Sequence, residues 1–303
     1  MTKVSIIIPM YNEQRYIARC LDSLKLQSYK DFELILIDDE SKDDTVKIAE
    51  WYKKDFNLTI LQQKNSGPGK ARNRWATGAK WNILIFVDAD MYFDEWYLQH
   101  LIQPILDGNE IGTAHWQELV WNPNNKLAVA WCINRIPHPE KRSGVYRAIL
   151  KDVFLKSGGF DPSKWYFDDN LNKINNWKWA LTVMKAICYH NNPENLQEIY
   201  KHSQRVGKSL LQSGEIKTYL KAYKKRIIGL IFIFWIWIIF LDKQIWMIVS
   251  IMIGSIIVLM FIKVIQRTIE EKYSSHIIYI PLMMMTRWFG YVVWMIKYLI
   301  VKK

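Results

Sequence analysis

The stretch Ile83-Leu84-Ile85-Phe86-Val87-Asp88-Ala89-Asp90 decides the fold, because an apolar run ends abruptly there on two carboxylates. Three other apolar runs in the first ninety residues, at 4–8, 33–37 and 58–61, also end in polar loops. Helical patterns follow the four loops, at 13–26, 42–54, 69–80 and 94–106. Strands that alternate with helices predict a parallel sheet of βαβ units. Ligands bind at the carboxyl ends of such strands, so the four loops should converge on one site.

Asp88 and Asp90 are the candidate ligands of a divalent cation. Mg²⁺ and Mn²⁺ prefer oxygen ligands and commonly take one or two carboxylates together with phosphate oxygens. A solvated turn is the alternative interpretation of this triplet taken alone. Its position after a wholly apolar strand, in register with the other polar loop tips, favours the cation site.

Two further loops carry groups suited to a phosphorylated nucleotide. Asp38-Asp39 ends the second run, and this pair of carboxylates favours a ligand with donors, such as a base or ribose, over a helix N-cap. Gly67-Pro68-Gly69-Lys70 opens a helix, where glycine lets the backbone approach closely and free N–H groups attract anions. Lys70 and Arg72 can then neutralise a diphosphate. The spacing is not that of a P-loop, which argues against an ATPase.

A second acidic pair, Asp168-Asp169, lies in the less regular region 110–200, after a glycine turn at 158–161 and an aromatic stretch at 165–167. A carboxylate beside bulky aromatic side chains binds a proton more tightly and can act as a general base. A surface acid in a loop is an equally good interpretation of this fragment alone. The six histidines show no metal-ligand spacing, so no zinc site is expected.

The C-terminal part has the composition of a membrane domain. Residues 224–303 hold 11 Lys and Arg against 3 Asp and Glu, which accounts for +8 of the net charge of +12. The uncharged segments 227–241 and 245–262 predict a transmembrane hairpin, with a third candidate span at 277–300, although buried core helices are the alternative. Basic residues at both ends of the hairpin place these ends in the cytosol. We therefore expect a multi-pass protein of the cytoplasmic membrane, in contact with anionic headgroups and not with nucleic acid.

The three cysteines are far apart in the sequence and odd in number. They form neither a disulfide framework nor a paired metal-binding motif. This usage is typical of a reducing compartment and agrees with a catalytic part in the cytosol.

Five motifs, in one order, resemble the family 2 glycosyltransferases of the GT-A fold. They are 4–13, 38–41, 65–73, 88–90, and 158–161 with its following acidic pair. The resemblance implies an α/β GT-A domain at 1–210, with a Rossmann-like, mixed but mainly parallel sheet. A basic linker helix at 211–226 and the membrane domain at 227–303 follow. The implied activity is inverting transfer of a sugar from a nucleotide-sugar donor, with Mg²⁺ or Mn²⁺ as cofactor.

The resemblance also assigns roles to matching residues. The nucleotide pocket is lined by three residues of the first loop, Pro9, Tyr11 and Glu13. Asp39 contacts the base, and Asp88 and Asp90 contact the ribose and the metal-bound diphosphate. Asp169 is the base that deprotonates the acceptor, and Asp168 is its partner in the acidic pair.

The chain departs from the family pattern at three points. Glu40 stands where the family usually has glycine, and Asp168 replaces the common glutamate, but neither change removes a needed carboxylate. The Gln-x-x-Arg-Trp signature of processive synthases is absent. Its absence favours one transfer per encounter over polymerisation.

The apolar tail is similar to that of polyprenyl-phosphate glycosyltransferases, which implies a lipid-linked acceptor, in the first place polyprenyl (dolichyl) phosphate. Three basic residues at i, i+3 and i+6 form one helical stripe that can bind a lipid phosphate, His202, Arg205 and Lys208. A solvated basic face is the alternative for that stripe. A lipid-linked oligosaccharide, a glycolipid or a surface polysaccharide is the alternative acceptor. An inactive membrane scaffold and a nucleotidyltransferase are the alternatives from other functional classes.

Overall fold

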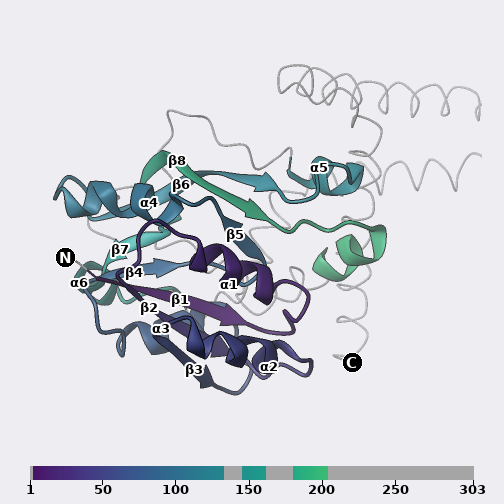
Figure 1. Cartoon of the computed structure of the whole chain (residues 1–303), viewed down its shortest axis with the longest axis horizontal. Coiled ribbons are helices and arrows are strands. Elements are labelled where there is room, and N and C mark those ends of the chain that lie inside the picture. Colours follow the sequence, from purple (N-terminus) through teal and green to yellow (C-terminus); the bar gives the residue numbers. More distant parts are fainter. Residues whose placement is uncertain (1–2, 133–144, 162–179, 204–303) are drawn as a thin grey trace, which may run out of the picture. The chain divides into compact units, whose positions relative to one another are not determined.

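A computed structural model describes residues 3–132, 145–161 and 180–203 of the chain (Figure 1). The described residues form two compact units. The first holds 3–123, 145–161 and 180–192, and the second holds 124–132 and 193–203. The predicted linker helix, the three predicted spans and the boundary at residue 210 lie outside the described residues. Within the described part of the chain, no helix is both long enough and apolar enough to cross a bilayer.

A mixed sheet of eight strands forms the centre of the first unit, in the order β3-β2-β1-β4-β7-β6-β8-β5. Strands β3, β2, β1 and β4 run parallel, whereas β7 pairs antiparallel with β4. Beyond β7, strands β6 and β8 are parallel to each other, and β5 is antiparallel to β8. The strands are β1 (Val4–Met10), β2 (Phe32–Asp38), β3 (Leu58–Gln62), β4 (Ile83–Phe86), β5 (Met91–Phe93), β6 (Gly112–Val120), β7 (Ala148–Leu150) and β8 (Leu181–His190).

Helices cover both faces of this sheet, because the central strands are apolar on both sides. One face packs against α1 (Ile17–Lys25), α2 (Thr45–Glu50) and α4 (Tyr97–Leu106). The other face packs against α3 (Pro68–Ala76) and α6 (Lys151–Lys156). A short 3-10 helix, η1 (Trp51–Lys54), follows α2. The predicted α/β fold, with a mixed and mainly parallel sheet, is confirmed.

The second unit contains α5 (Lys126–Cys132) and a helical stretch at 196–203. The Asn125 side-chain amide donates a hydrogen bond to the carbonyl of Glu194 (2.9 Å). The rings of Trp131 and His202 meet edge to face, with centroids 4.8 Å apart. These contacts link its two described segments.

Candidate active site

The parallel strands bring the predicted loops to one edge of the sheet. The backbone N–H of Asp39 donates to the carbonyl of Met10 (2.9 Å), which joins the ends of β2 and β1. The N–H of Gln63 donates to the carbonyl of Asp38 (3.0 Å) and adds the end of β3. The N–H of Val87 donates to Ile7 (3.4 Å), so the loop after β4 lies beside β1.

Asp39 holds the glycine-rich loop in shape. Its carboxylate accepts hydrogen bonds from the backbone N–H groups of Ser66 (2.9 Å) and Gly67 (2.8 Å), and from the Gln63 side-chain amide (2.8 Å). Asp39 is 4% exposed, and Gly67 has φ +91°, in the region that favours glycine. In the structure Asp39 orders the loop before α3. The predicted contact of Asp39 with a base stays a prediction.

Glu40 has φ +73° and therefore lies in the left-handed region. The family resemblance placed a glycine there. The chain thus keeps the backbone conformation that a glycine adopts easily, although it carries a glutamate at this position. The side chain of Glu40 is exposed and accepts a long hydrogen bond from the N–H of Asn65 (3.4 Å).

Two arginines hold the carboxylate of Asp88. Arg72 donates to Oδ1, and Arg147 donates to Oδ2 (3.2 Å). Both arginines are buried, at 2% and 5% exposed. Burial raises the pKa of Asp88, but the charges of Arg72 and Arg147 outweigh this effect and leave the pKa below its usual value. In the structure the Arg72 guanidinium contacts Asp88 and keeps it ionised. The predicted contact of Arg72 with a diphosphate stays a prediction.

A second carboxylate, Glu118 on β6, shares Arg147. Arg147 donates to Glu118 (3.1 Å), and Nε2 of His115 lies 3.2 Å from the same oxygen. The other ring nitrogen of His115 lies 3.0 Å from the hydroxyl of Tyr97. Burial raises the pKa of Glu118, but the neighbouring histidines and Arg147 hold it well below its usual value. This network links Asp88 to the interior, and we did not predict it from the sequence.

Asp90 faces His190 at the end of β8. Pairing of β5 with β8 places Met91 opposite His190, and the His190 Nε2 lies 3.5 Å from an Asp90 oxygen. Burial raises the pKa of Asp90, His190 opposes this rise, and the charge of Asp88 adds to it. Nδ1 of His190 lies 2.9 Å from the carbonyl of Asn191, which can only accept, so Nδ1 carries a proton. In the neutral ring the lone pair is then on Nε2, toward Asp90.

This donor set fits an Mg²⁺ or Mn²⁺ ion that arrives with a nucleotide. Within the described residues, no group of three or more His, Cys, Asp or Glu side chains can hold a metal by itself. Asp90 and His190 supply a carboxylate and an imidazole, which leaves most of an octahedral shell to other ligands. Diphosphate oxygens and water commonly fill such positions around Mg²⁺.

The remaining predicted nucleotide-binding residues lie around the same edge. Pro9 is near the end of β1, and Tyr11 after it is 46% exposed. The N–H of Glu13 donates to Thr45 Oγ1 (2.7 Å), which joins the first loop to α2. Lys70 is exposed in the first turn of α3.

The predicted acceptor and base residues are mostly outside the described part of the chain. Asp168, Asp169, Arg205 and Lys208 all lie there. His202 lies in the second unit, with its ring against Trp131. The stripe that it forms with Arg205 and Lys208 stays a prediction.

The turn that precedes the acidic pair is attached to α3. The Asn73 side chain accepts from the N–H of Phe160 (2.8 Å) and donates to its carbonyl (2.7 Å). Gly159 has φ +70°, and a Cβ there would clash with the Asn73 Oδ1. The glycine is therefore required by both conformation and space.

Comparisons with known proteins agree with this geometry. Residues 5–151 match the family described as glycosyl transferase family 2. The chain is 40% identical over 101 residues to the uncharacterized glycosyltransferase EpsJ of Bacillus subtilis, covering 33% of this chain and 29% of the relative. It is 38% identical over 99 residues to the poly(ribitol-phosphate) beta-N-acetylglucosaminyltransferase TarS of Staphylococcus aureus, covering 31% and 17%. The matches thus span less than a third of the length of these relatives.

Solved structures share the fold. A Pyrobaculum calidifontis mannosyltransferase in complex with GDP-Man and Mn²⁺ has a TM-score of 0.58 at 15% identity, covering 92% of this chain and 86% of that one. S. aureus TarS 1–349 in complex with UDP-GlcNAc has a TM-score of 0.53 at 22% identity, covering 69% and 67%. Residues 5–151 of the chain therefore form a domain of glycosyl transferase family 2.

Proposed function

We propose that this protein transfers a sugar from a nucleotide-sugar donor to a lipid-linked acceptor, with inversion at the anomeric carbon. One observation carries the proposal. Asp88 and Asp90 leave β4 at the same sheet edge where Asp39 orders the glycine-rich loop before α3. An anion-binding helix start and a cation-binding carboxylate are thus parts of one site.

Different residues bind different parts of the nucleotide-sugar donor. The N–H groups at the start of α3, with Lys70 beside them, bind diphosphate oxygens. Asp90 and His190 would hold the divalent cation, which would supply positive charge to neutralise the departing diphosphate. Arg72 and Arg147 keep Asp88 ionised and fixed, ready to accept from the donor's ribose. Asp169 deprotonates a hydroxyl acceptor, or orients an acceptor phosphate that is already ionised.

We further propose that residues 227–303 anchor the protein in the cytoplasmic membrane, with the catalytic domain in the cytosol. The uncharged segments and the basic residues at their ends support this arrangement. Polyprenyl phosphate is then the first candidate acceptor. A surface polymer is the second, because similar proteins bear names that specify poly(ribitol-phosphate) as the acceptor.

A transfer assay tests the proposal. Membranes with the full chain receive Mn²⁺, a panel of labelled nucleotide-sugars, and a short polyprenyl phosphate or a polyol-phosphate polymer. We expect labelled product with one acceptor. A lipid product stable to alkali and labile to mild acid identifies the polyprenyl phosphate.

Asp90→Asn should lower the rate by about 100-fold or more, since charge stabilisation of a leaving group contributes several kcal/mol. The matched control is Glu40→Gln, which removes an exposed carboxylate of the same site edge. Full activity of Asp90→Asn would refute the role of the cation. Tight nucleotide binding without transfer to any acceptor would instead favour the inactive scaffold.

A further inference from the structure

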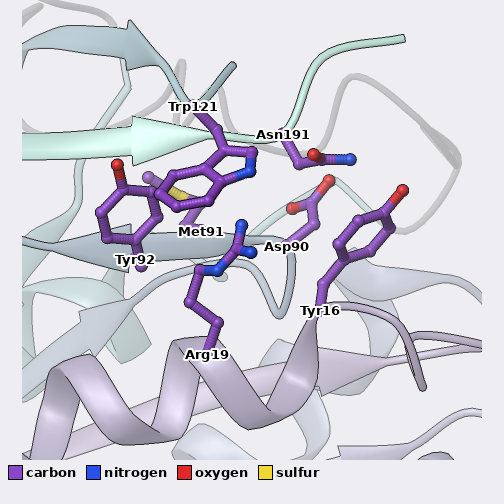
Figure 2. A pocket seen from close by; sticks show the side chains of 7 residues that line it. All are labelled: Tyr16, Arg19, Asp90, Met91, Tyr92, Trp121 and Asn191. Atoms are coloured by element: carbon purple, nitrogen blue, oxygen red, sulfur yellow. The ribbon is translucent and has the colours of Figure 1, made fainter. Parts of the chain in front are cut away.

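A small pocket adjoins Asp90 on the side of α1 and β5. It is lined by Tyr16, Arg19, Asp90, Met91, Tyr92, Trp121 and Asn191, and its volume is about 10 Å³. Figure 2 shows the side chains of Arg19, Trp121 and Asp90 pointing toward one another. A space of this size admits a water-sized group, such as one oxygen-bearing corner of a larger ligand.

An aromatic platform holds the guanidinium of Arg19 in place. The guanidinium carbon lies 3.4 Å from the ring centroid of Trp121 and 5.9 Å from that of Tyr92. Tyr92 meets Trp121 edge to face and stacks on Tyr189 with centroids 4.4 Å apart. The backbone N–H of Trp121 donates to the carbonyl of His190 (3.3 Å), which places this residue beside the end of β8.

Stacking occupies only the face of the guanidinium. Its N–H donors lie in the plane and stay available for an anion, in the fork that matches phosphate oxygens. Within the residues that the structure describes, no carboxylate forms an ion pair with Arg19. Among the described residues, Arg19 is thus an oriented cation without an ion-pair partner, and it lines the same pocket as Asp90.

The pocket and the glycine-rich loop reach the site through different elements. Asp39 and the glycine-rich loop belong to β2, β3 and α3, whereas Tyr92, Trp121 and Asn191 belong to β5 and the ends of β6 and β8. A ligand in the pocket therefore lies beside Asp90 without occupying the glycine-rich loop.

We propose that Arg19, on its Trp121 platform, binds a phosphate ester of the acceptor. The inference rests on the proposed function and adds the residue that holds the phosphate group of the acceptor. A lipid monophosphate and a polyol phosphate share this chemistry. The bound phosphate places the acceptor beside the cation and diphosphate held at Asp90.

Calorimetric titration of the full chain in detergent tests the proposal with two probes, farnesyl phosphate and ribitol 5-phosphate. Farnesol and ribitol are the neutral controls. The variants are Arg19→Ala, Arg19→Lys, and the matched control Arg74→Ala, an exposed arginine that stacks on Trp75 of α3. Because Arg19 is exposed, we expect its truncation to leave the fold intact.

We expect at least one phosphate probe to bind more tightly than its neutral control, and the probe that does so identifies the source. Arg19→Ala should weaken this binding about tenfold or more, with Arg19→Lys in between and Arg74→Ala unchanged. Affinity for UDP and GDP with Mn²⁺ should stay within about twofold in all three variants.

Three results would overturn the inference: phosphate binding by Arg19→Ala equal to that of the wild type, no preference of the wild type for either phosphate probe, or a parallel loss of nucleotide affinity. The last result would assign Arg19 to the donor diphosphate. Failure of the wild type to bind any nucleotide with Mn²⁺ would instead count against the proposed function, so the two failures are distinguishable.

Discussion

Replacing Asp39 by asparagine should loosen the glycine-rich loop. Oδ1 accepts from Ser66 and from Gln63, and Oδ2 accepts from the N–H of Gly67. The asparagine oxygen can replace only one of these acceptors. The amide oxygen will keep the hydrogen bonds from Ser66 and Gln63. The amide NH₂ will then face the buried N–H of Gly67, so the hydrogen bond from Gly67 is lost.

The magnitude follows from the bond that is lost. A hydrogen bond to a charged group contributes about 1.5–3 kcal/mol. For a domain of this size each kcal/mol lowers Tm by about 2–4 °C, so Asp39→Asn should melt about 3–12 °C lower. The same energy shifts the equilibrium between ordered and loosened loop by about 10- to 150-fold, and UDP affinity falls by up to that factor.

Thermal melts and calorimetric titration of UDP with Mn²⁺ measure both effects. Glu40→Gln is the matched control, because it removes the neighbouring, exposed carboxylate and should change Tm by less than about 2 °C. If Asp39→Asn keeps the Tm and the nucleotide affinity of the wild type, Asp39 does not order the loop.

Two further predictions concern the surroundings of the site. Pairing with His115 and Arg147 lowers the pKa of Glu118 in the folded protein. The ionised side chain therefore stabilises the fold at every pH above the ordinary glutamate pKa near 4.3. This contribution is lost as the pH falls through the lower pKa of the folded protein. Glu118→Gln should therefore melt lower than the wild type from pH 5 to 8, with a gap that closes below about pH 4; a gap independent of pH would contradict the pairing. Gly159→Ala should cost about 1–3 kcal/mol in denaturant unfolding, since it adds a Cβ against Asn73 at a positive φ, and an unchanged midpoint would show that the turn adapts.

The first half of the fold could be predicted from the sequence because its central strands, β1, β2 and β4, are apolar on both faces. The strand expected at 33–37 is β2 (Phe32–Asp38), and the helix expected at 69–80 begins at Pro68 and ends earlier, at Ala76. The polar loops that follow these strands could then meet only at the carboxyl-end edge of the sheet. Parallel pairing fixes their convergence before any side-chain geometry is known.

The far half of the sheet was harder to predict. β6 and β8 are long strands in a region that lacked a regular pattern, because polar side chains such as His115 and Glu118 occupy inward positions of β6. The partnership of Asp90 with His190 depends on the pairing of β5 with β8, across a hundred residues of sequence. Spacing along the chain carries no signal of such a contact. The sequence feature that could indicate this buried network is a charged residue within an apolar run, as at Arg147 before β7.

Calorimetric titration of UDP and GDP into the full chain, with Mn²⁺ and then with EDTA, tests the central claim most directly. The wild type should bind one of the nucleotides about tenfold or more tightly with Mn²⁺, because Asp90 would hold the cation and the cation would neutralise the charge of the diphosphate. Asp90→Asn should bind the nucleotide, both with Mn²⁺ and with EDTA, as weakly as the wild type binds it with EDTA. Wild-type affinity that is indifferent to Mn²⁺, or Asp90→Asn that still responds to it, would contradict the claim that Asp90 holds the cation of a nucleotide-sugar.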